Sequence, residues 1–201
     1  MNRFAKRALD LCLAIIGLVL SIPFWIFLCP VIYLQDWGPV LFLQERCGKG
    51  GHSFRIIKFR TMQKPTDGKH LVLSLENDPR VTRAGRWLRT TALDELPVLI
   101  NILKGDMSFV GPKPLPFIID RPNSLYAEIS QVPDYDIRIK VRPGLTGMAQ
   151  VYTSKDIDHA TKFNFDKLYV ERMSFWLDVK LIILSFWIAF MGKWESRQKK
   201  V

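Results

Sequence analysis

The sequence predicts an α+β protein that associates with a membrane through a bent N-terminal helix. Residues 11–34 contain no charged side chain, and this run has about the length that a bilayer core requires of a helix. Residues 38–60 contain short strand-like segments separated by glycines. Elsewhere, apolar residues recur at helical spacing between proline and glycine breaks. We therefore expect a small β-hairpin or sheet, several amphipathic and interfacial helices, and one membrane helix.

The composition is both basic and apolar. The 201 residues carry a formal net charge of +10, a pI of about 9.7 and 48% hydrophobic residues. Such a charge favours anionic partners, namely nucleic acid, phospholipid head groups or phosphorylated metabolites, and the apolar content favours a membrane surface. The length suits one domain with appended membrane elements. The cysteines show no metal spacing, and we expect them to be reduced.

The N-terminal apolar run is too long for a cleavable signal peptide, and no small-residue cleavage site closes it. Pro23 lies near its middle, close to Ser21, and a proline inside a helix removes a backbone hydrogen bond and bends the axis. The charges that flank the run are balanced, whereas the charges around a spanning helix are usually asymmetric. They are Arg3, Lys6 and Arg7 before it and Arg46, Lys49 and Arg55 after it. We therefore predict a re-entrant helix over residues 1–36 and a folded domain over residues 37–201.

The hairpin is predicted from residues 38–46 and 54–60, with a tight turn at Gly48, Gly50 and Gly51. Lys58 and Arg60 are then expected on one face, because side chains alternate along a strand. The alternative is that both belong only to the solvated side of the sheet. The glycine cluster lacks the Walker lysine pattern and the dinucleotide fingerprint, so neither type of phosphate loop is predicted.

The acidic pair Asp94 and Glu95 stands in a basic neighbourhood. A helix is predicted to begin at this pair, to include Pro97 in its first turn and to end at Gly105, because Leu96, Leu99, Ile100 and Leu103 recur at helical spacing. The simple alternative is an N-cap carboxylate beside a first-turn acid. Cations on both sides favour a site that holds a phosphate; they are Arg83, Arg86 and Arg89 before the pair and Lys113 of Gly111-Pro112-Lys113-Pro114 after it.

Such a site permits a definite chemistry. A carboxylate can attack a phosphorus atom to form an acyl phosphate, while the neighbouring acid and a Mg²⁺ ion hold the phosphate charge. Mg²⁺ prefers oxygen ligands and keeps waters, so one or two carboxylates and a substrate diphosphate suffice. The histidines are isolated and no zinc signature is present.

The remaining segments give weaker signals. A helix capped by Thr82 is predicted to end at about Arg89, residues 63–80 are predicted as a loop, and residues 141–147 as a glycine-rich turn. Arg142 at the mouth of that turn is either a phosphate ligand or a plain surface charge. Further helices are predicted over residues 125–131, 163–173 and 181–192. The last is too short to span a bilayer, so we expect it to lie at an interface or to pack on the core.

Short motifs follow one another along nearly the whole chain. They are Lys6-Arg7 with Asp10, Ser21-Ile-Pro23, Gly38-Pro39-Val40 with Gln44-Glu-Arg46, Lys58-Phe-Arg60-Thr61-Met, Asn77-Asp-Pro-Arg80, Leu93-Asp94-Glu95-Leu-Pro97, Lys104-Gly-Asp-Met-Ser108-Phe-Val-Gly-Pro112, Arg142-Pro-Gly-Leu-Thr-Gly147 and Asp166-Lys-Leu-Tyr169. Together they resemble the bacterial sugar transferase family, the monotopic phosphoglycosyl transferases. The chain resembles the small form of this family, which consists of the catalytic module without extra spanning helices.

The resemblance implies transfer of a phosphosugar from a UDP-sugar to polyprenyl phosphate, with release of UMP, at the cytoplasmic face of the bacterial inner membrane. It implies that Asp94 is the nucleophile and that Glu95 binds Mg²⁺ with it or handles the proton of the acceptor. The substrate-binding candidates are Lys58, Arg60, Thr61, Arg89, Pro112, Lys113 and Arg142, and the membrane bend is assigned to Ser21 and Pro23. Membrane phospholipids are the further partners, no nucleic acid is expected, and a homodimer is compatible with the family.

Departures from the family pattern occur at the third residue of Gly-Pro-Lys113, where the family usually has arginine, and at Ile22, which separates a Ser-Pro pair that is usually adjacent. A lysine offers a point charge and not a bidentate fork. The alternatives to an enzyme are a non-catalytic membrane scaffold and a basic nucleic-acid-binding protein, although the charges here are scattered among glycine and proline motifs and form no basic stripe. Residues 63–76 and 116–136 are expected to select the sugar, whose identity the sequence leaves open.

Overall fold

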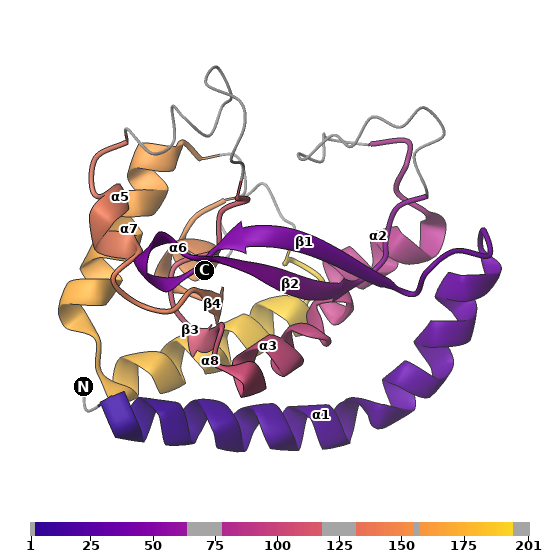
Figure 1. Cartoon of the computed structure of the whole chain (residues 1–201), viewed down its shortest axis with the longest axis horizontal. Coiled ribbons are helices and arrows are strands. Elements are labelled where there is room, and N and C mark those ends of the chain that lie inside the picture. Colours follow the sequence, from indigo (N-terminus) through magenta and orange to yellow (C-terminus); the bar gives the residue numbers. More distant parts are fainter. Residues whose placement is uncertain (1–2, 64–77, 118–131, 155–156, 195–201) are drawn as a thin grey trace.

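The computed structural model of the chain describes residues 3–63, 78–117, 132–154 and 157–194 (Figure 1). Its first element is helix α1, Arg3–Leu34, which contains Pro23 and Pro30. Figure 1 shows α1 running along the base of the molecule and then turning upward in its C-terminal part, as expected for a helix interrupted by prolines. Within the described residues, α1 is the single helix whose length and composition would allow it to cross a membrane.

The hydroxyl of Ser21 does not bond the carbonyl that Pro23 leaves without a donor. Pro23 lacks the N–H that would bond the carbonyl of Val19 four residues earlier. The Ser21 hydroxyl donates to the carbonyl of Leu18 at 2.8 Å and not to Val19, and it accepts from the Trp25 indole at 3.1 Å. The expectation that Ser21 does not replace the lost donor in the usual way is therefore confirmed.

The predicted hairpin is confirmed. Strands β1, Leu41–Cys47, and β2, Ser53–Phe59, pair antiparallel, with Leu41 opposite Phe59 and Cys47 opposite Ser53. The connecting 3₁₀ turn η1, Lys49–Gly51, places Gly50 at φ 69° and Gly51 at φ 80°. Only glycine adopts such positive φ values without steric cost, so the glycines make this turn.

The acidic pair does not start an α-helix, so that part of the prediction is wrong. Asp94 and Glu95 lie in a separate 3₁₀ turn, η2 (Leu93–Glu95), and helix α3 (Val98–Lys104) begins after Pro97. Ala92, at φ 59°, turns the chain into η2, and Pro97 has no N–H to donate into a continuous helical ladder. The predicted end at Gly105 is confirmed, with φ 92°. Helix α2, Arg83–Thr90, is also confirmed, and its cap Thr82 accepts a bond from the Gly85 N–H.

The second half adds a parallel pair of strands and further helices. Strand β3, Ser108–Val110, pairs with β4, Gly144–Thr146, where a turn was predicted. The two strands lie so close that a Cβ on Gly144 would be 2.1 Å from the Gly111 nitrogen. Because glycine has no Cβ, Gly144 permits this close pairing as well as a turn. Among residues 132–154 and 157–194, the helices that follow β3 are α5 (Tyr135–Arg138), α6 (Met148–Tyr152), α7 (His159–Arg172) and α8 (Phe175–Phe190).

Helices α7 and α8 confirm the two C-terminal predictions, although each begins earlier than expected. The helix expected at 125–131 and most of the loop expected at 63–80 fall outside the described residues. The main core joins α1, β2, α3, β3, α7 and α8 through Ala14, Ile56, Val98, Ile102, Val110, Tyr169, Leu181 and Ile188. A second cluster joins the C-terminal part of α1 to β2 and α2 through Leu28, Ile32, Phe59 and Leu88. Both clusters pack α1 onto the folded domain.

Candidate active site

The centre of the candidate site is the contact between the end of β2 and the turn η2. Lys58 forms an ion pair with Glu95, and both side chains are largely buried. Asp94 is 8% exposed. Burial by itself would lower the pKa of Lys58, but the negative charges of Glu95 and Asp94 outweigh it and raise that pKa above its usual value. One ammonium group is therefore held in the field of two neighbouring carboxylates.

Helix α2 adds a guanidinium beside this cluster. The Nε of Arg89 donates to the hydroxyl of Thr61 at 2.9 Å, and the backbone N–H of Thr82 donates to the Thr61 carbonyl at 3.1 Å. Gly85 makes this approach possible, because a Cβ there would lie 2.1 Å from the Thr61 carbonyl oxygen. Both α2 and β2 contact η2. The structure thus gathers Lys58, Thr61, Arg89, Asp94 and Glu95 at one end of the hairpin.

Arg60 has other partners. Its guanidinium forms an ion pair with Asp36 and donates to the carbonyl of Ile32 at 3.2 Å, at the C-terminal end of α1. Its side chain is 9% exposed. Lys58 and Arg60 were expected on one face of the hairpin; in the structure Lys58 contacts the acidic turn, and Arg60 contacts the C-terminal end of α1. A role for Arg60 in substrate binding stays a prediction.

Of the other predicted ligands, Arg142 lies at the opposite end of α3, and Pro112 and Lys113 contact β4 and α5. The Nε of Arg142 donates to the carbonyl of Gly105 at 2.7 Å, just past the C-terminus of α3. From Glu95 to Gly105 the chain advances roughly 15 Å at the rise of a helix. The carbonyl of Pro112 accepts from the Gly144 N–H at 2.9 Å. The carbonyl of Lys113 accepts from Arg138 at 2.6 Å. Arg142 is therefore not brought to the acidic turn, and the backbones of Pro112 and Lys113 are joined to β4 and α5.

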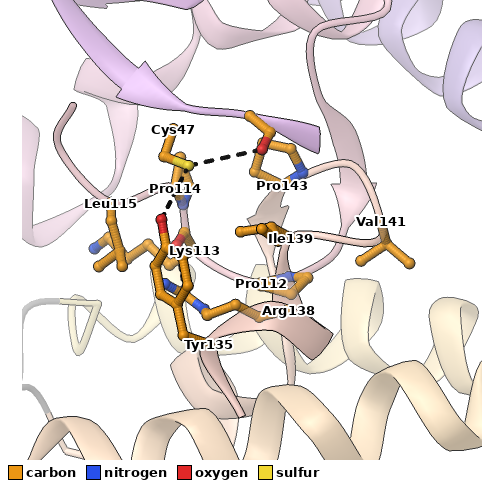
Figure 2. A pocket seen from close by; sticks show the side chains of 11 residues that line it. Cys47, Pro112, Lys113, Pro114, Leu115, Tyr135, Arg138, Ile139, Val141 and Pro143 are labelled. Atoms are coloured by element: carbon orange, nitrogen blue, oxygen red, sulfur yellow. Dashed lines mark hydrogen bonds between the residues drawn. The ribbon is translucent and has the colours of Figure 1, made fainter. Parts of the chain in front are cut away.

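A pocket forms where Pro112 and Lys113 meet the turn of the hairpin (Figure 2). Its lining comprises Cys47, Gly48, Pro112, Lys113, Pro114, Leu115, Tyr135, Arg138, Ile139, Val141 and Pro143. The Cys47 thiol lies 3.5 Å from the Tyr135 hydroxyl. Burial and this contact raise the pKa of Tyr135 to about 12. Sequence reasoning missed Cys47, Tyr135 and Arg138 as lining residues, because nothing in their spacing indicates that they meet.

Arg138 and Asp166 form the buried charge pair beneath this pocket. The Nε of Arg138 donates to Asp166 at 3.1 Å, and its guanidinium lies 4.3 Å from the centre of the Phe163 ring. Burial lowers the pKa of Arg138, against the opposing effect of Asp166. Burial also raises the pKa of Asp166 to about 6, although the arginine opposes the shift. The pair fixes α5 against α7 and thereby positions the Lys113 carbonyl.

The two carboxylates at η2 would suit a Mg²⁺ ion whose other ligands were water and phosphate oxygens. Within the part of the chain that the structure describes, no group of three or more His, Cys, Asp or Glu side chains could hold a metal by itself. Asp94 and Glu95 nevertheless supply carboxylate oxygens from neighbouring positions. Mg²⁺ sites commonly use one or two carboxylates and complete the shell with water and substrate phosphates. A dedicated protein cage is therefore not required.

Comparison with known proteins gives consistent matches over this whole arrangement. A family model described as bacterial sugar transferase matches residues 1–192. The chain is 37% identical over 198 residues to the UDP-glucose:undecaprenyl-phosphate glucose-1-phosphate transferase of Escherichia coli K12, which covers 96% of this chain and 42% of that protein. It is 38% identical over 182 residues to the UDP-N-acetylgalactosamine-undecaprenyl-phosphate N-acetylgalactosaminephosphotransferase of Aeromonas hydrophila. That match covers 89% of this chain and 42% of that protein.

A third relative has a length similar to that of this chain. The exopolysaccharide production protein PSS of Rhizobium leguminosarum bv. phaseoli is 37% identical over 188 residues, which cover 90% of this chain and 93% of that protein. The chain therefore spans less than half the length of the first two relatives and most of the length of the third. The match includes α1, the hairpin and the acidic turn.

Proposed function

Because the chain belongs to the bacterial sugar transferase family, we propose that it transfers a phosphosugar from a UDP-sugar to a polyprenyl phosphate such as undecaprenyl phosphate, with release of UMP. The observation that carries the proposal is the acidic turn, where Asp94 and Glu95 are held against Lys58 beside Arg89. The names of the relatives specify glucose, N-acetylgalactosamine and galactose, so the sugar is left open.

The reaction that we propose has two displacements at one phosphorus atom. A carboxylate oxygen of Asp94 forms a bond to the phosphorus that bears the sugar, and the bond from that phosphorus to the UMP oxygen breaks, so UMP leaves with the electron pair. An oxygen of polyprenyl phosphate then attacks the same phosphorus and releases Asp94. Splitting one transfer into two steps is the usual gain of covalent catalysis. Asp94 is only 8% exposed, so little water has to be removed before it attacks.

Lys58, Arg89 and Glu95 have supporting parts in this proposal. Lys58 and Arg89 would offset the charge that develops on the phosphate oxygens. Glu95, which Lys58 holds in place, would accept a proton from the acceptor phosphate if it arrives protonated. Mg²⁺ held by Asp94 and Glu95 would supply further charge neutralisation on the diphosphate. Chelation of divalent ions is expected to stop turnover, and addition of Mg²⁺ is expected to restore it.

The contacts at both ends of α1 support a re-entrant membrane helix. Near its N-terminus, Lys6 forms an ion pair with Asp178 of α8 at 2.6 Å. At its C-terminus, the carbonyl of Ile32 accepts a bond from Arg60, which directly follows β2. A helix that crossed a hydrocarbon core of about 30 Å would place its ends on opposite sides, whereas both ends here contact one folded domain (Figure 1). Basic residues favour the cytoplasmic side, so we place the domain and its site there.

Exposed apolar side chains complete the membrane proposal. The middle of α1 presents Ile15, Ile16, Val19, Leu20, Ile26 and Phe27 to the outside, and α8 presents Trp176, Ile183, Phe186, Trp187 and Phe190. The opposite face of α8 is buried in the core through Leu181 and Ile188. Both faces of α8 are therefore apolar, and tryptophan side chains on an exposed apolar face suit the interface between lipid and water. We therefore propose phospholipids as partners of these surfaces.

Intact-protein mass spectrometry tests the chemistry. The purified protein is incubated with Mg²⁺ and each of a panel of UDP-sugars, without acceptor lipid. A mass gain of one phosphosugar that is absent in Asp94→Asn is the expected result. Absence of both an adduct and UMP release with every donor, when polyprenyl phosphate is also present, would favour a non-catalytic scaffold. Normal turnover in a folded Asp94→Asn variant would disprove the nucleophile assignment.

Cysteine labelling tests the topology separately. In a cysteine-free background, Arg3→Cys and Lys49→Cys place single thiols at exposed positions, one at the first residue of α1 and one after its C-terminal end. Both thiols are expected to react with a membrane-impermeant reagent from the same side of inverted vesicles. Labelling from opposite sides would show that α1 crosses the membrane.

A further inference from the structure

The amide side chain of Asn101 takes the place of a neighbouring strand along the open edge of β2. Asn101 lies on α3 and is 1% exposed. Its Oδ1 accepts from the N–H of Ile57 at 3.0 Å, and its Nδ2 donates to the carbonyl of Arg55 at 2.7 Å. The other edge of β2 is occupied by β1. One side chain thus makes the donor-and-acceptor pair that a third strand would make with alternate residues of β2.

The orientation of this amide group is fully determined by its surroundings. Its Nδ2 has two hydrogens, and the second is directed to a carboxylate oxygen of Asp106 at 3.2 Å. The backbone carbonyl of Asn101 accepts from the N–H groups of Gly105 and Asp106, each at 3.1 Å, where α3 ends. A flipped amide would direct its NH₂ toward the Ile57 N–H, donor against donor. Asn101 therefore joins one register of β2 to one position of α3.

We propose that Asn101 is a positioning residue of the active site, because it sets the position of β2 relative to α3 and thereby holds Lys58 against Glu95. Lys58 follows Ile57 directly in β2, and Glu95 lies in η2, immediately before α3. A slip of β2 by one residue would offer the amide the wrong backbone groups, and a slip by two would move Lys58 by about 7 Å. Either slip breaks the ion pair. The catalytic consequence rests on the function proposed above, but the positional claim does not.

Two substitutions separate hydrogen bonding from size. Asn101→Leu keeps a side chain of similar volume and removes both bonds to β2. Asn101→Asp keeps the shape and the acceptor for Ile57, but it sets an oxygen against the Arg55 carbonyl and the Asp106 carboxylate. The matched control is Ser185→Ala, which removes a buried side-chain hydrogen bond to Thr146, between α8 and β4. The Ser185 hydroxyl bonds Thr146 of β4 and the Leu181 carbonyl of α8, so its hydrogen bonds do not involve β2.

The first measurement is independent of any enzymatic activity. The coupling free energy of Lys58 with Glu95 is obtained from a double-mutant cycle of Lys58→Met and Glu95→Gln, by urea unfolding in detergent. The cycle is repeated in the Asn101→Leu and Ser185→Ala backgrounds. We expect the coupling to vanish with Asn101→Leu and to persist with Ser185→Ala, and amide exchange at Ile57 to accelerate at least about fivefold in the former. Unchanged coupling in Asn101→Leu would overturn the proposal. If that variant does not fold, Asn101→Asp provides the same test.

The second measurement is phosphosugar adduct formation with the active donor. Lys58→Met and Asn101→Leu are expected to be non-additive, so that the double variant is within about twofold of the slower single variant. The fold-losses in adduct formation caused by Lys58→Met and Ser185→Ala are expected to multiply, which means that their free-energy effects add. Additive losses for the Asn101 pair would also overturn the positional claim. Absence of any adduct in the unmodified protein would contradict the proposed function alone, because the coupling cycle remains measurable.

Discussion

Replacement of Gly85 by alanine tests the packing of α2 on the candidate site. Alanine is a better helix former than glycine by about 1 kcal/mol in a helix interior, so local propensity predicts that Gly85→Ala stabilises the protein. The structure predicts the opposite sign. A Cβ at this position would lie 2.1 Å from the carbonyl oxygen and 2.8 Å from the carbonyl carbon of Thr61. The atoms in the way are backbone, so no rotation of a side chain relieves the clash.

The cost follows from what has to move. To reach an ordinary contact distance, α2 has to withdraw by more than about 1 Å. That displacement breaks the bond from the Thr82 N–H to the Thr61 carbonyl, at 3.1 Å, and the bond from Arg89 to the Thr61 hydroxyl, at 2.9 Å. Each bond contributes about 1 kcal/mol, and overpacking adds about 1–3 kcal/mol. After the gain in helix propensity, we expect a net loss of about 2–4 kcal/mol in the free energy of unfolding.

Urea unfolding in detergent measures this loss, and adduct formation reports whether Arg89 is displaced from the site. The matched control is Ala84→Gly, the reverse exchange at the preceding position of α2. It is expected to cost no more than about 1 kcal/mol and to leave the rate of adduct formation within about twofold of the unmodified protein. If Gly85→Ala proves as stable as the unmodified protein, then α2 does not pack against Thr61 as described.

Three further predictions concern buried charges. Lys58→Met is expected to lower the free energy of unfolding by about 3 kcal/mol, because Glu95 is left buried without its cation; adding Glu95→Gln should recover part of this in urea unfolding, and equal stability of the single and double variants would contradict it. Lys6→Met should lower the free energy of unfolding by a similar amount, because it leaves the carboxylate of Asp178, which is 1% exposed, without its cation. As the control, adding Asp178→Leu should recover part of that loss. Burial raises the pKa of Asp166 from 3.8 to about 6, so the native state retains a proton that the unfolded chain releases. Its contribution to stability is full below about pH 3.8 and is lost as the pH rises through about 6; the thermal midpoint should fall over this range, and Asp166→Asn should remove that part of the slope.

The local elements of the fold were largely predictable from the sequence. The glycines of the hairpin turn, Thr82 before α2 and Gly105 after α3 act through their own backbone and its nearest neighbours. The helix start at Asp94 was wrong because an apolar period does not distinguish a 3₁₀ turn from the first turn of an α-helix. The strand at Gly144 was missed because glycine signals a turn locally, whereas here its missing side chain admits another strand.

The candidate site likewise has a part that was predictable from the sequence and a part that was not. The acidic pair and the cations around it were recognisable, because their types and spacing indicate phosphate chemistry. The contact of Lys58 with Glu95, the pairing of Arg60 with Asp36 and the position of Arg142 beyond α3 were not recognisable. Each cation has several acids and carbonyls in the sequence that could be its partner, and sequence spacing does not show which of them it contacts.

The sequence by itself determined the apolar helix and its prolines, the hairpin, the helix ends and the presence of two adjacent carboxylates, because backbone conformation and apolar period are local properties. The tertiary structure alone decided that Asn101 completes the edge of β2, that Arg138 pairs with Asp166, and that Lys58 faces the acidic turn. The physical reason is that a buried polar group has to find a partner. Which partner it finds depends on how the elements pack, and that packing is set by contacts between residues far apart in the chain.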